Sequence, residues 1–314
     1  MNKYIIGIDL GGRSIKFGLF TEDGDLINKS NIITRTDEDG KHILPDLVEH
    51  LHKIFTKYNL TKESLIGIGL GVPGPILNKR VVVRAVNLGW EGNVHAADYI
   101  EEHTGIRVLV ENDANVAALG EMWKGAAEGY QDVVMVTLGT GVGGGIISNG
   151  KLISGSTGSG GEIGHMPFLQ NPIERTCGCG GNRCLEQVAS ATGIEYIAQD
   201  YLFRYDIESK LKEYDGLTAK DIFECAKEKD ELALKITEEY FNHLGRGLAI
   251  VGSIVDPAIF VIGGGVSHAG DFLIDNLRES YKKYAFSVIR NSQFVQATLG
   301  NDAGIYGAAK LIIN

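Results

Sequence analysis

YIIGIDLGGRSIKFGLF, residues 4–20, is the stretch that predicts the fold of the first part of the chain. An apolar run, two glycines and a second apolar run form the pattern of a β-hairpin with a tight turn. A similar stretch, DVVMVTLGTGVGGGII, lies at residues 132–147, and an Asp-Gly or Asn-Gly pair follows each hairpin, at residues 23–24 and 149–150. Two matching hairpins predict two duplicated α/β domains.

Apolar spacing outside the hairpins predicts alternating helices and strands. The stretch LIGIGLGV at residues 65–72 is typical of a buried strand, and residues 44–58 keep a helical period. Residues 248–266 are the most apolar long stretch, but Asp256-Pro257 and several glycines interrupt it, which indicates a helix, a turn and a strand instead of a membrane span. Further strands are expected at 108–111 and 259–262, and further helices at 114–124, 186–200, 218–229, 232–253 and 303–312.

The order of these elements predicts two domains. Residues 1–115 together with 303–314 form the predicted small N-terminal α/β domain, because the last helix can pack back on the first sheet. Residues 116–302 form the predicted larger α/β domain, which contains a cysteine-rich loop. No low-complexity linker separates the two, and 314 residues are enough for two hydrophobic cores.

The composition limits the classes of partner. The formal net charge is −10 and no basic arm or stripe is present, so electrostatic capture of nucleic acid is not expected. Asp9 interrupts the apolar run after Met1 too early for a signal peptide, which favours a soluble cytoplasmic protein. The 42 glycines lie in clusters, a pattern that indicates close contact between backbone and ligand.

Three of the four cysteines lie in the stretch TCGCGGNRC, residues 176–184. With His165 they follow the spacing His-x11-Cys-x-Cys-x4-Cys, and three thiolates with one imidazole form the ligand set of a closed, four-coordinate zinc site. A disulfide framework is the alternative, but a bridge between Cys177 and Cys179 would be strained, and a chain of this length does not need one. The lone Cys225 lies in an amphipathic stretch and is expected to be a core thiol.

Both hairpin turns carry the residues of a phosphate-binding loop. In the first, Asp9 precedes Gly11 and Gly12, so backbone N–H groups can approach a phosphate while the carboxylate holds Mg²⁺ through water. In the second, LGTGVGGG at residues 138–145 adds the hydroxyl of Thr140. A plain hairpin turn is the alternative for either loop alone. A strand follows each turn and no Gly-Lys-Ser/Thr is present, so neither turn matches a Walker loop or a dinucleotide fingerprint.

Asp113 is the candidate general base. It lies in ENDAN, residues 111–115, where a predicted strand ends and a predicted helix begins, and such strand ends are where α/β proteins bind ligands. The alternative is that Asp113 is only the N-cap of the helix. The neighbouring Asn112 and the other loops expected at this edge favour a carboxylate that accepts the proton of a hydroxyl as its oxygen attacks a γ-phosphate.

The sequence resembles the ROK family of sugar kinases, in particular its bacterial glucokinases. The motifs are DLGG (9–12), GVPGP (71–75), NLGW (87–90), ENDAN (111–115), TLGTGVGGG (137–145), GEIGH (161–165), CGCG with CLE (177–186) and VIGGGV (261–266), which cover essentially the whole chain. The resemblance implies an α/β fold with two ribonuclease-H-like domains of the actin-like ATPase type around a central cleft. It also implies Mg·ATP and structural zinc as cofactors, and a homodimer or homotetramer.

The resemblance also implies roles for individual residues, with Asp113 as the catalytic base. The positions that match sugar ligands are Asn87, Asn112, Asp113, Glu162, His165 and Glu186. The positions assigned to the nucleotide and its Mg²⁺ are Asp9, Gly11, Gly12, Arg13, Thr140, Gly141 and Gly264. The positions that match zinc ligands are His165, Cys177, Cys179 and Cys184. His165 would then bind zinc through one nitrogen and donate to a sugar hydroxyl through the other.

Two positions depart from the family pattern. Arg13 replaces the threonine that usually follows DLGG, and it either supplies a phosphate donor or points to solvent. Arg183 replaces the glycine that usually precedes the last zinc cysteine, and it carries strain if that position requires a positive φ.

The predicted reaction is ATP-dependent phosphorylation of a hexose at its 6-hydroxyl, with glucose giving glucose 6-phosphate. A kinase for N-acetylmannosamine, N-acetylglucosamine or fructose is the alternative within the same chemistry. A sugar-binding family member without catalysis is a further alternative, because of Arg13. A sugar-responsive repressor would need a DNA-binding helix-turn-helix ahead of the first strand, and only eight residues precede Asp9.

Overall fold

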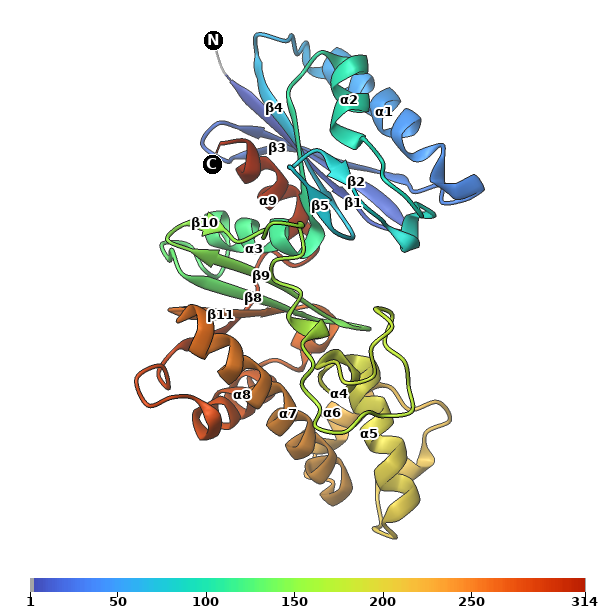
Figure 1. Ribbon diagram of the computed structural model, residues 1–314, viewed down its shortest axis with the longest axis vertical. Coiled ribbons are helices and arrows are strands. Elements are labelled where there is room, and N and C mark those ends of the chain that lie inside the picture. Colours follow the sequence, from blue (N-terminus) through green and yellow to red (C-terminus); the bar gives the residue numbers. More distant parts are fainter. Residues whose placement is uncertain (1–2, 314) are drawn as a thin grey trace. The chain divides into compact units, whose positions relative to one another are not determined.

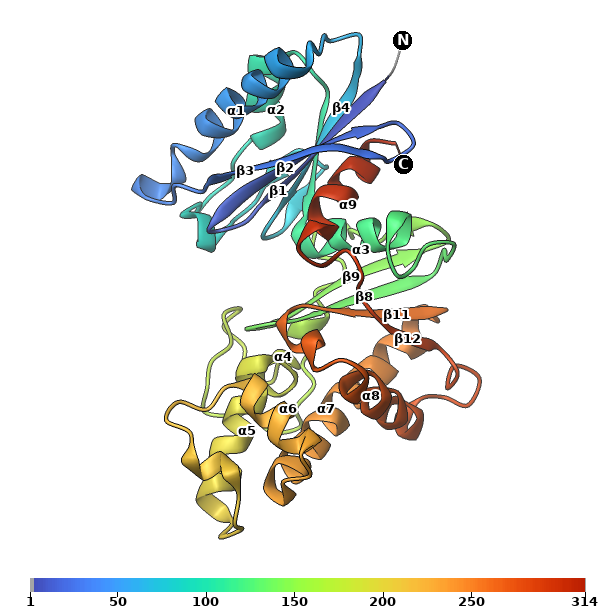
Figure 2. The same cartoon turned by 180° about the vertical axis from the view of Figure 1, so that it is seen from behind.

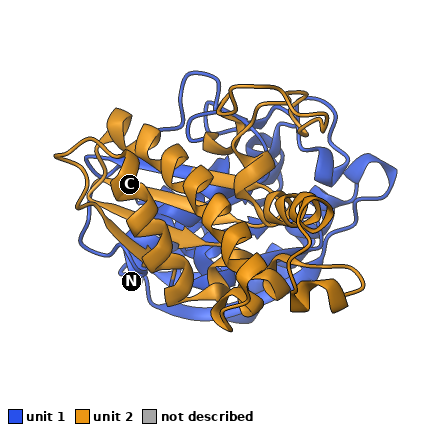
Figure 3. Cartoon of the chain, turned by 90° about the horizontal axis from the view of Figure 1, so that it is seen from below, with its two compact units in different colours: residues 1–131, 145–161, 298–314 blue, residues 132–144, 162–297 orange. Residues whose placement is uncertain are grey.

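The computed structural model describes residues 3–313, and the contacts within it divide the chain into two compact units (Figure 3). Unit 1 consists of residues 1–131, 145–161 and 298–314, and unit 2 consists of residues 132–144 and 162–297. Each unit therefore combines segments that are distant in the sequence.

The first sheet belongs to unit 1 and has five strands in the order β3-β2-β1-β4-β7. The predicted hairpin forms its centre, because β1 and β2 pair antiparallel and β3 continues the antiparallel pairing. β4 and β7 extend the sheet on the other side of β1 and run parallel to it. The strands are β1 Tyr4–Leu10, β2 Ser14–Thr21, β3 Leu26–Ile33, β4 Leu65–Val72 and β7 Val108–Asn112.

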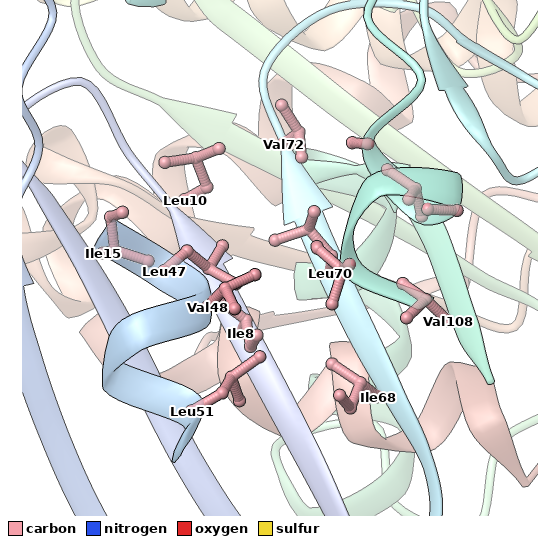
Figure 4. Close-up of a cluster of buried hydrophobic side chains, with 14 of the residues drawn as sticks. Ile8, Leu10, Ile15, Leu47, Val48, Leu51, Ile68, Leu70, Val72 and Val108 are labelled. Carbon is pink, nitrogen blue, oxygen red and sulfur yellow. The ribbon is translucent and has the colours of Figure 1, made fainter. Parts of the chain in front are cut away.

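Helices cover both faces of the first sheet (Figures 1 and 2). Alternate residues of β1 point to opposite faces, so Ile6, Ile8 and Leu10 join the core beneath α1 and α2, whereas Ile5 joins the core beneath α9. Figure 4 shows side chains of β1, β4 and α1 interlocking in the first of these cores. The helices of unit 1 are α1 Ile43–Tyr58, α2 Ala96–Thr104, α3 Asp113–Lys124 and α9 Ala303–Ile312.

Glycines let α9 pack unusually close to its neighbours. A Cβ atom at Gly7 of β1 would overlap the carbonyl oxygen of Ile305 in α9, and one at Gly69 of β4 would overlap the carbonyl oxygen of Ala308. On the opposite side of α9, a Cβ at Gly307 would overlap the carbonyl oxygen of Val116 in α3. The helix is therefore held backbone to backbone between the sheet and α3, and no side chain fits in these three contacts.

The second sheet repeats the arrangement of the first, with the order β10-β9-β8-β11-β12. β8 and β9 contain the second hairpin and occupy the places that β1 and β2 have in the first sheet, and β11 runs parallel to both β8 and β12. The strands are β8 Val133–Leu138, β9 Val142–Ser148, β10 Lys151–Leu152, β11 Ile259–Gly263 and β12 Gln293–Gln296. The division into units passes through β9, so β10 is counted with unit 1.

The helices of unit 2 pack around an aromatic core. Ring contacts join Phe223 of α6 to Tyr240 and Phe241 of α7, and Phe272 at the start of α8 completes the cluster. The helices are α4 Glu186–Ala189, α5 Ala191–Arg204, α6 Ala219–Lys227, α7 Glu231–Val255 and α8 Asp271–Tyr284. The single helix predicted at residues 186–200 is wrong. Ser190 has extended backbone and its hydroxyl accepts a hydrogen bond from Gly193, which ends α4 and caps α5.

Most other predicted elements are present, and the last helix has the predicted bounds. β3, α2, α8 and β12 were not predicted. Smaller elements are β5 Ile76–Leu77 and β6 Val81–Val82, and the 3₁₀ helices Glu38–Gly40, Val86–Leu88, Ile163–His165, Lys210–Glu213, Gly265–Ala269 and Gly300–Asp302. Within residues 3–313, none of the helices has the length and apolar character needed to cross a membrane.

The units defined by contacts do not follow the predicted domain limits of 1–115 with 303–314, and 116–302. The whole of α3 lies in unit 1, because it packs against α9. The domain limits, as independently folding parts, stay a prediction.

Gly69→Ala is expected to lower the stability of unit 1. The new methyl group would overlap the backbone of α9, and such overpacking typically costs about 1–3 kcal/mol in the free energy of unfolding. Chemical denaturation measures the change. Gly92→Ala is the matched control, because no atom lies within 4 Å of a Cβ at that position and its φ is not positive. Equal stability of the two variants would contradict this account of the α9 contacts.

Candidate active site

In unit 1, Asn112 and Asp113 lie where β7 ends and α3 begins. The Asn112 side-chain oxygen accepts hydrogen bonds from the backbone of Ala114 at 2.9 Å and of Asn115 at 3.2 Å, so Asn112 is the N-cap of the helix. The alternative that Asp113 is only an N-cap is therefore wrong, because Asp113 is the first residue of α3 and is exposed. An exposed carboxylate at a strand end is placed to contact a ligand.

Glu111 supports this junction and was not identified from the sequence. It is only 1% exposed, and its carboxylate accepts hydrogen bonds from the Asn112 backbone, the Asn115 side chain and the Ser154 hydroxyl, the last at 2.7 Å. Three donors compensate a buried carboxylate and fix the backbone on which Asp113 stands. The feature of the sequence that could have pointed to Glu111 is a carboxylate near the C-terminal end of a predicted apolar strand.

The first hairpin turn contains the other predicted residues of unit 1 except Asn87. Asp9 is paired with Lys16 across the hairpin at 3.0 Å, so Lys16 is a further charged group at this turn that sequence reasoning missed. The Thr34 hydroxyl donates to the carbonyl of Gly11 at 2.6 Å and braces the turn. A Cβ atom at Gly12 would lie 3.3 Å from the backbone oxygen of Asn87, so these two predicted residues are neighbours.

Arg13 is exposed beside this turn. Among residues 3–313 it forms no ion pair, and the choice between its two expected roles, a phosphate donor or a side chain in solvent, stays a prediction. Because no carboxylate among the described residues pairs with it, the Arg13 guanidinium is available to bind a phosphate at the turn.

In unit 2, the second hairpin turn borders a cavity of about 620 Å³. Thr140 lines the cavity, and Gly264 lies directly beside its wall with a φ of 82°, where a Cβ would overlap the carbonyl oxygen of Leu138. The volume is within the range of pockets that hold small molecules and cofactors. The lining residues that sequence reasoning missed include Glu195, Thr218, Lys220, Phe223 and His268.

Glu186, the first residue of α4, joins the second hairpin turn to the cysteine-rich loop. One of its carboxylate oxygens accepts from the backbone of Val142 at 3.3 Å, and the other accepts from the Cys177 thiol at 2.8 Å. A Cβ at Gly141 would overlap the same carboxylate, so a larger residue at that position would displace the Glu186 side chain. The predicted nucleotide loop, a predicted sugar ligand and a predicted metal ligand are therefore in direct contact within unit 2.

The His165 ring has neighbours on both sides. Its Nδ1 atom is 3.4 Å from the Cys177 sulfur and 3.8 Å from Glu186, whereas its Nε2 atom is 3.8 Å from Glu162. One nitrogen thus faces the cysteines and the other faces the carboxylate of a predicted sugar ligand. This orientation suits a residue that serves a metal and a sugar at the same time.

The four predicted metal ligands form a compact group. One ligand atom from each of His165, Cys177, Cys179 and Cys184 lies within 4.8 Å of the others, and the sulfurs of Cys179 and Cys184 are 3.4 Å apart. Zn–S bonds of about 2.3 Å in a tetrahedron place sulfurs about 3.8 Å apart, so the donor set fits zinc. All four cysteines of the chain are free.

The thiols of this group do not share one pKa shift. Burial raises the pKa of Cys177 and of Cys184, whereas the pKa of Cys179 is lowered, because hydrogen bonds to its sulfur outweigh the effect of burial. A divalent cation stabilises the thiolate forms, which are the forms that bind metal.

Gln187 anchors the cysteine-rich loop and was also missed. Its side chain accepts from the Cys184 backbone at 3.0 Å and donates to the Arg175 carbonyl at 2.6 Å, and the Arg175 guanidinium stacks 3.6 Å over the Tyr196 ring. Arg183 does not have a positive φ, so the suggested backbone strain at this residue is absent.

The paired strand orders and the two glycine-rich hairpin turns define an α/β protein of the actin-like ATPase fold. The family model described as "ROK family" matches residues 5–314. The chain belongs to the ROK family.

Three similar proteins cover nearly the whole chain. A glucokinase of Halalkalibacterium halodurans is 40% identical over 99% of this chain and 95% of its own length. An N-acetyl-D-glucosamine kinase of Vibrio cholerae is 32% identical over 98% of this chain and 99% of its own length. The crystal structure of a ROK family glucokinase from Streptomyces griseus, in complex with glucose and AMPPNP, matches with a TM-score of 0.76 and 33% identity over 98% of each chain.

The purified protein is expected to contain about one zinc ion per chain, held by the four-residue group. Cys179→Ser removes one of the thiolates, so elemental analysis should find much less zinc and thermal unfolding should begin at a lower temperature. Cys225→Ser is the control, because that thiol lies outside the group and the variant should keep its zinc. Zinc content that is the same in all three proteins would contradict the assignment.

Proposed function

We propose that this protein transfers the γ-phosphate of ATP to the 6-hydroxyl of glucose, with Asp113 as the general base. As a member of the ROK family that is similar over nearly its whole length to glucokinases, it is an ATP-dependent sugar kinase; the choice of glucose and the roles of single residues are the proposal. The observation that carries it is the contact of Glu186 with both the second hairpin turn and the His165–Cys177 pair.

The chemical step follows from the proposed roles. Asp113 takes the proton of the sugar hydroxyl as that oxygen attacks the γ-phosphorus, and ADP leaves with the electron pair of the broken P–O bond. Mg²⁺, when bound with ATP, neutralises the charge that develops on the phosphates. The protein forms no covalent bond to either substrate in this step. It contributes by positioning the two substrates and by excluding water.

The remaining site residues are proposed to bind the two substrates. The proposed sugar ligands are Asn87, Asn112, Asp113, Glu162, His165 and Glu186. The proposed nucleotide and Mg²⁺ contacts are Asp9, Gly11, Gly12, Arg13, Thr140, Gly141 and Gly264. In this scheme Asp9 would hold Mg²⁺ through water, and Lys16, which now neutralises Asp9, would pair with a phosphate.

Zinc has a structural role in the proposal. His165, Cys177, Cys179 and Cys184 would hold the metal and would leave no position for a reacting water. Held in this way, the His165 ring would keep its Nε2 atom toward Glu162, and the loop that leads into Glu186 would be fixed. The proposal also includes a cytoplasmic location, where ATP is abundant, and a homodimer or homotetramer as the assembled form.

A kinase for an N-acetylated hexosamine is the second candidate, and the 32% identity to an N-acetyl-D-glucosamine kinase favours it over a fructose kinase. A sugar-binding protein without catalysis is the third, because Arg13 stands in place of the usual threonine.

Turnover is expected to be fastest with glucose among glucose, N-acetylglucosamine, N-acetylmannosamine and fructose. A coupled assay of ADP release with Mg·ATP gives kcat/KM for each sugar. Highest kcat/KM for an N-acetylated sugar would overturn the glucose assignment and retain the kinase. Sugar binding without ADP release from any of the four would overturn the kinase assignment itself.

Asp113→Asn is expected to lower kcat by about 10²–10⁴-fold, because an amide cannot accept the hydroxyl proton. Glucose binding, measured by calorimetry, should persist, since the amide keeps the size of the side chain and Asn112 still caps α3. The control is Asp215→Asn, an exposed carboxylate of unit 2 that is outside both proposed sites. Near-normal turnover of the Asp113 variant would show that another group is the base.

A further inference from the structure

A second, basic pocket lies in unit 2, between the C-terminal half of α8 and the loop that leads into β12. Its volume is about 240 Å³, which is room for roughly eight water molecules at about 30 Å³ each. Its lining includes Arg278, Lys282, Arg290, Asn291, Gln293 and Phe294. None of these residues lines the cavity beside Thr140.

The lining contains three cationic side chains and no carboxylate, although the chain as a whole has a net charge of −10. Arg278 and Lys282 each form an ion pair with a carboxylate one turn earlier on α8, at 2.9 and 2.8 Å. Both of those carboxylate side chains are about two-thirds exposed, and such surface pairs contribute only about 0–1 kcal/mol. An anion in the pocket therefore competes with weak partners.

Arg290 is oriented by a backbone hydrogen bond. Among residues 3–313 it forms no ion pair, and its Nε atom donates to the backbone carbonyl of Ala285 at 3.1 Å. The Nη2 atom of Arg278 is held in the same way by the carbonyl of Phe294 at 3.3 Å. Both guanidinium groups are thus oriented by backbone before any ligand arrives, and less side-chain freedom is lost when they bind.

The edge of the second sheet adds a backbone donor. β12 is the last strand of that sheet, with β11 on its inner side. Gln293 and Ala297 donate their backbone N–H groups toward the β11 side, to Ala258 and Ile262. Along a strand, the backbone groups of successive residues point alternately to one side and to the other. The N–H of Phe294 therefore points away from β11, toward the open edge of the sheet, as does its carbonyl, which accepts from Arg278.

We propose that this pocket binds the phosphate group of a small metabolite. Two guanidinium groups and an ammonium group supply charge and planar forks that match phosphate oxygens, and the side-chain amides of Asn291 and Gln293 with the Phe294 N–H supply neutral donors. Inorganic phosphate and a hexose phosphate share this chemistry, and the volume accommodates either. This site is separate from the one proposed for catalysis and does not depend on it.

The test is calorimetric titration of the zinc-replete protein, saturated with glucose and AMPPNP so that the proposed catalytic site is occupied. Inorganic phosphate and glucose 6-phosphate are the two probes. We expect one saturable site per chain that weakens at high salt, because exposed charges are screened. Tighter binding of glucose 6-phosphate would identify a sugar phosphate as the ligand, and equal binding would identify the phosphate group alone.

Arg290→Gln and the double variant Lys282→Gln with Arg290→Gln should weaken binding about tenfold or more, since each removes a charged hydrogen-bond donor. The matched control is Lys283→Gln, which removes the next cation along α8 but lies outside the pocket. Turnover should be unchanged in all three, which also shows that they fold. Absence of phosphate binding, or equal weakening by Lys283→Gln, would overturn the proposal.

Discussion

The backbone contact of α9 with β1, β4 and α3 is the constraint on which the rest of unit 1 depends. Gly7, Gly69 and Gly307 leave no room for a side chain, so α9 can sit in only one place and at one depth. Asp9 follows two residues after Gly7 on the same face of β1, and Gly304 of α9 is packed directly against its carboxylate. On the other side of α9 lies α3, whose first residue is Asp113. The two candidate site carboxylates of unit 1 are thus positioned by one helix.

Two carboxylates at the ends of secondary-structure elements connect the neighbouring loops. Glu111, the second-last residue of β7, ties three donors of neighbouring segments together. Glu186 begins α4 and bridges the second hairpin turn to the cysteine-rich loop. The charge of Glu111 is compensated by its three hydrogen bonds, and removing a donor would leave a poorly solvated carboxylate. The positions of the exposed site residues therefore depend on partly or fully buried neighbours.

The sequence was sufficient for elements whose own residues carry a regular pattern. The two hairpins, β4 and α9 were predicted because apolar runs, glycine pairs and helical spacing are local properties. β3 was missed because it alternates half-buried and exposed positions in a polar stretch, and β12 because it has only four residues. Ser190 was not recognised as a break, although serine is a preferred N-cap residue and its bond to Gly193 is local.

The residues of the candidate site also fall into some that a local pattern predicted and others that it did not. The four predicted metal ligands were singled out from their spacing, and the structure places them together. Lys16, Gln187 and Glu111 could not be assigned, because their roles depend on partners that are distant in the chain or on the pairing register. Asn112 and Asp113 were both singled out, yet only the hydrogen bonds show that the first caps α3 and leaves the second exposed.

The place of α9 has a consequence for the biosynthesis of the chain. Residues 298–313 complete the core of unit 1, yet they leave the ribosome after every residue of unit 2. Ile5, Gly7 and Gly69 must therefore wait, with an apolar sheet face uncovered, while some two hundred further residues are translated, about ten to forty seconds at typical rates. The nascent first sheet is the part of this protein that a chaperone would most need to shield.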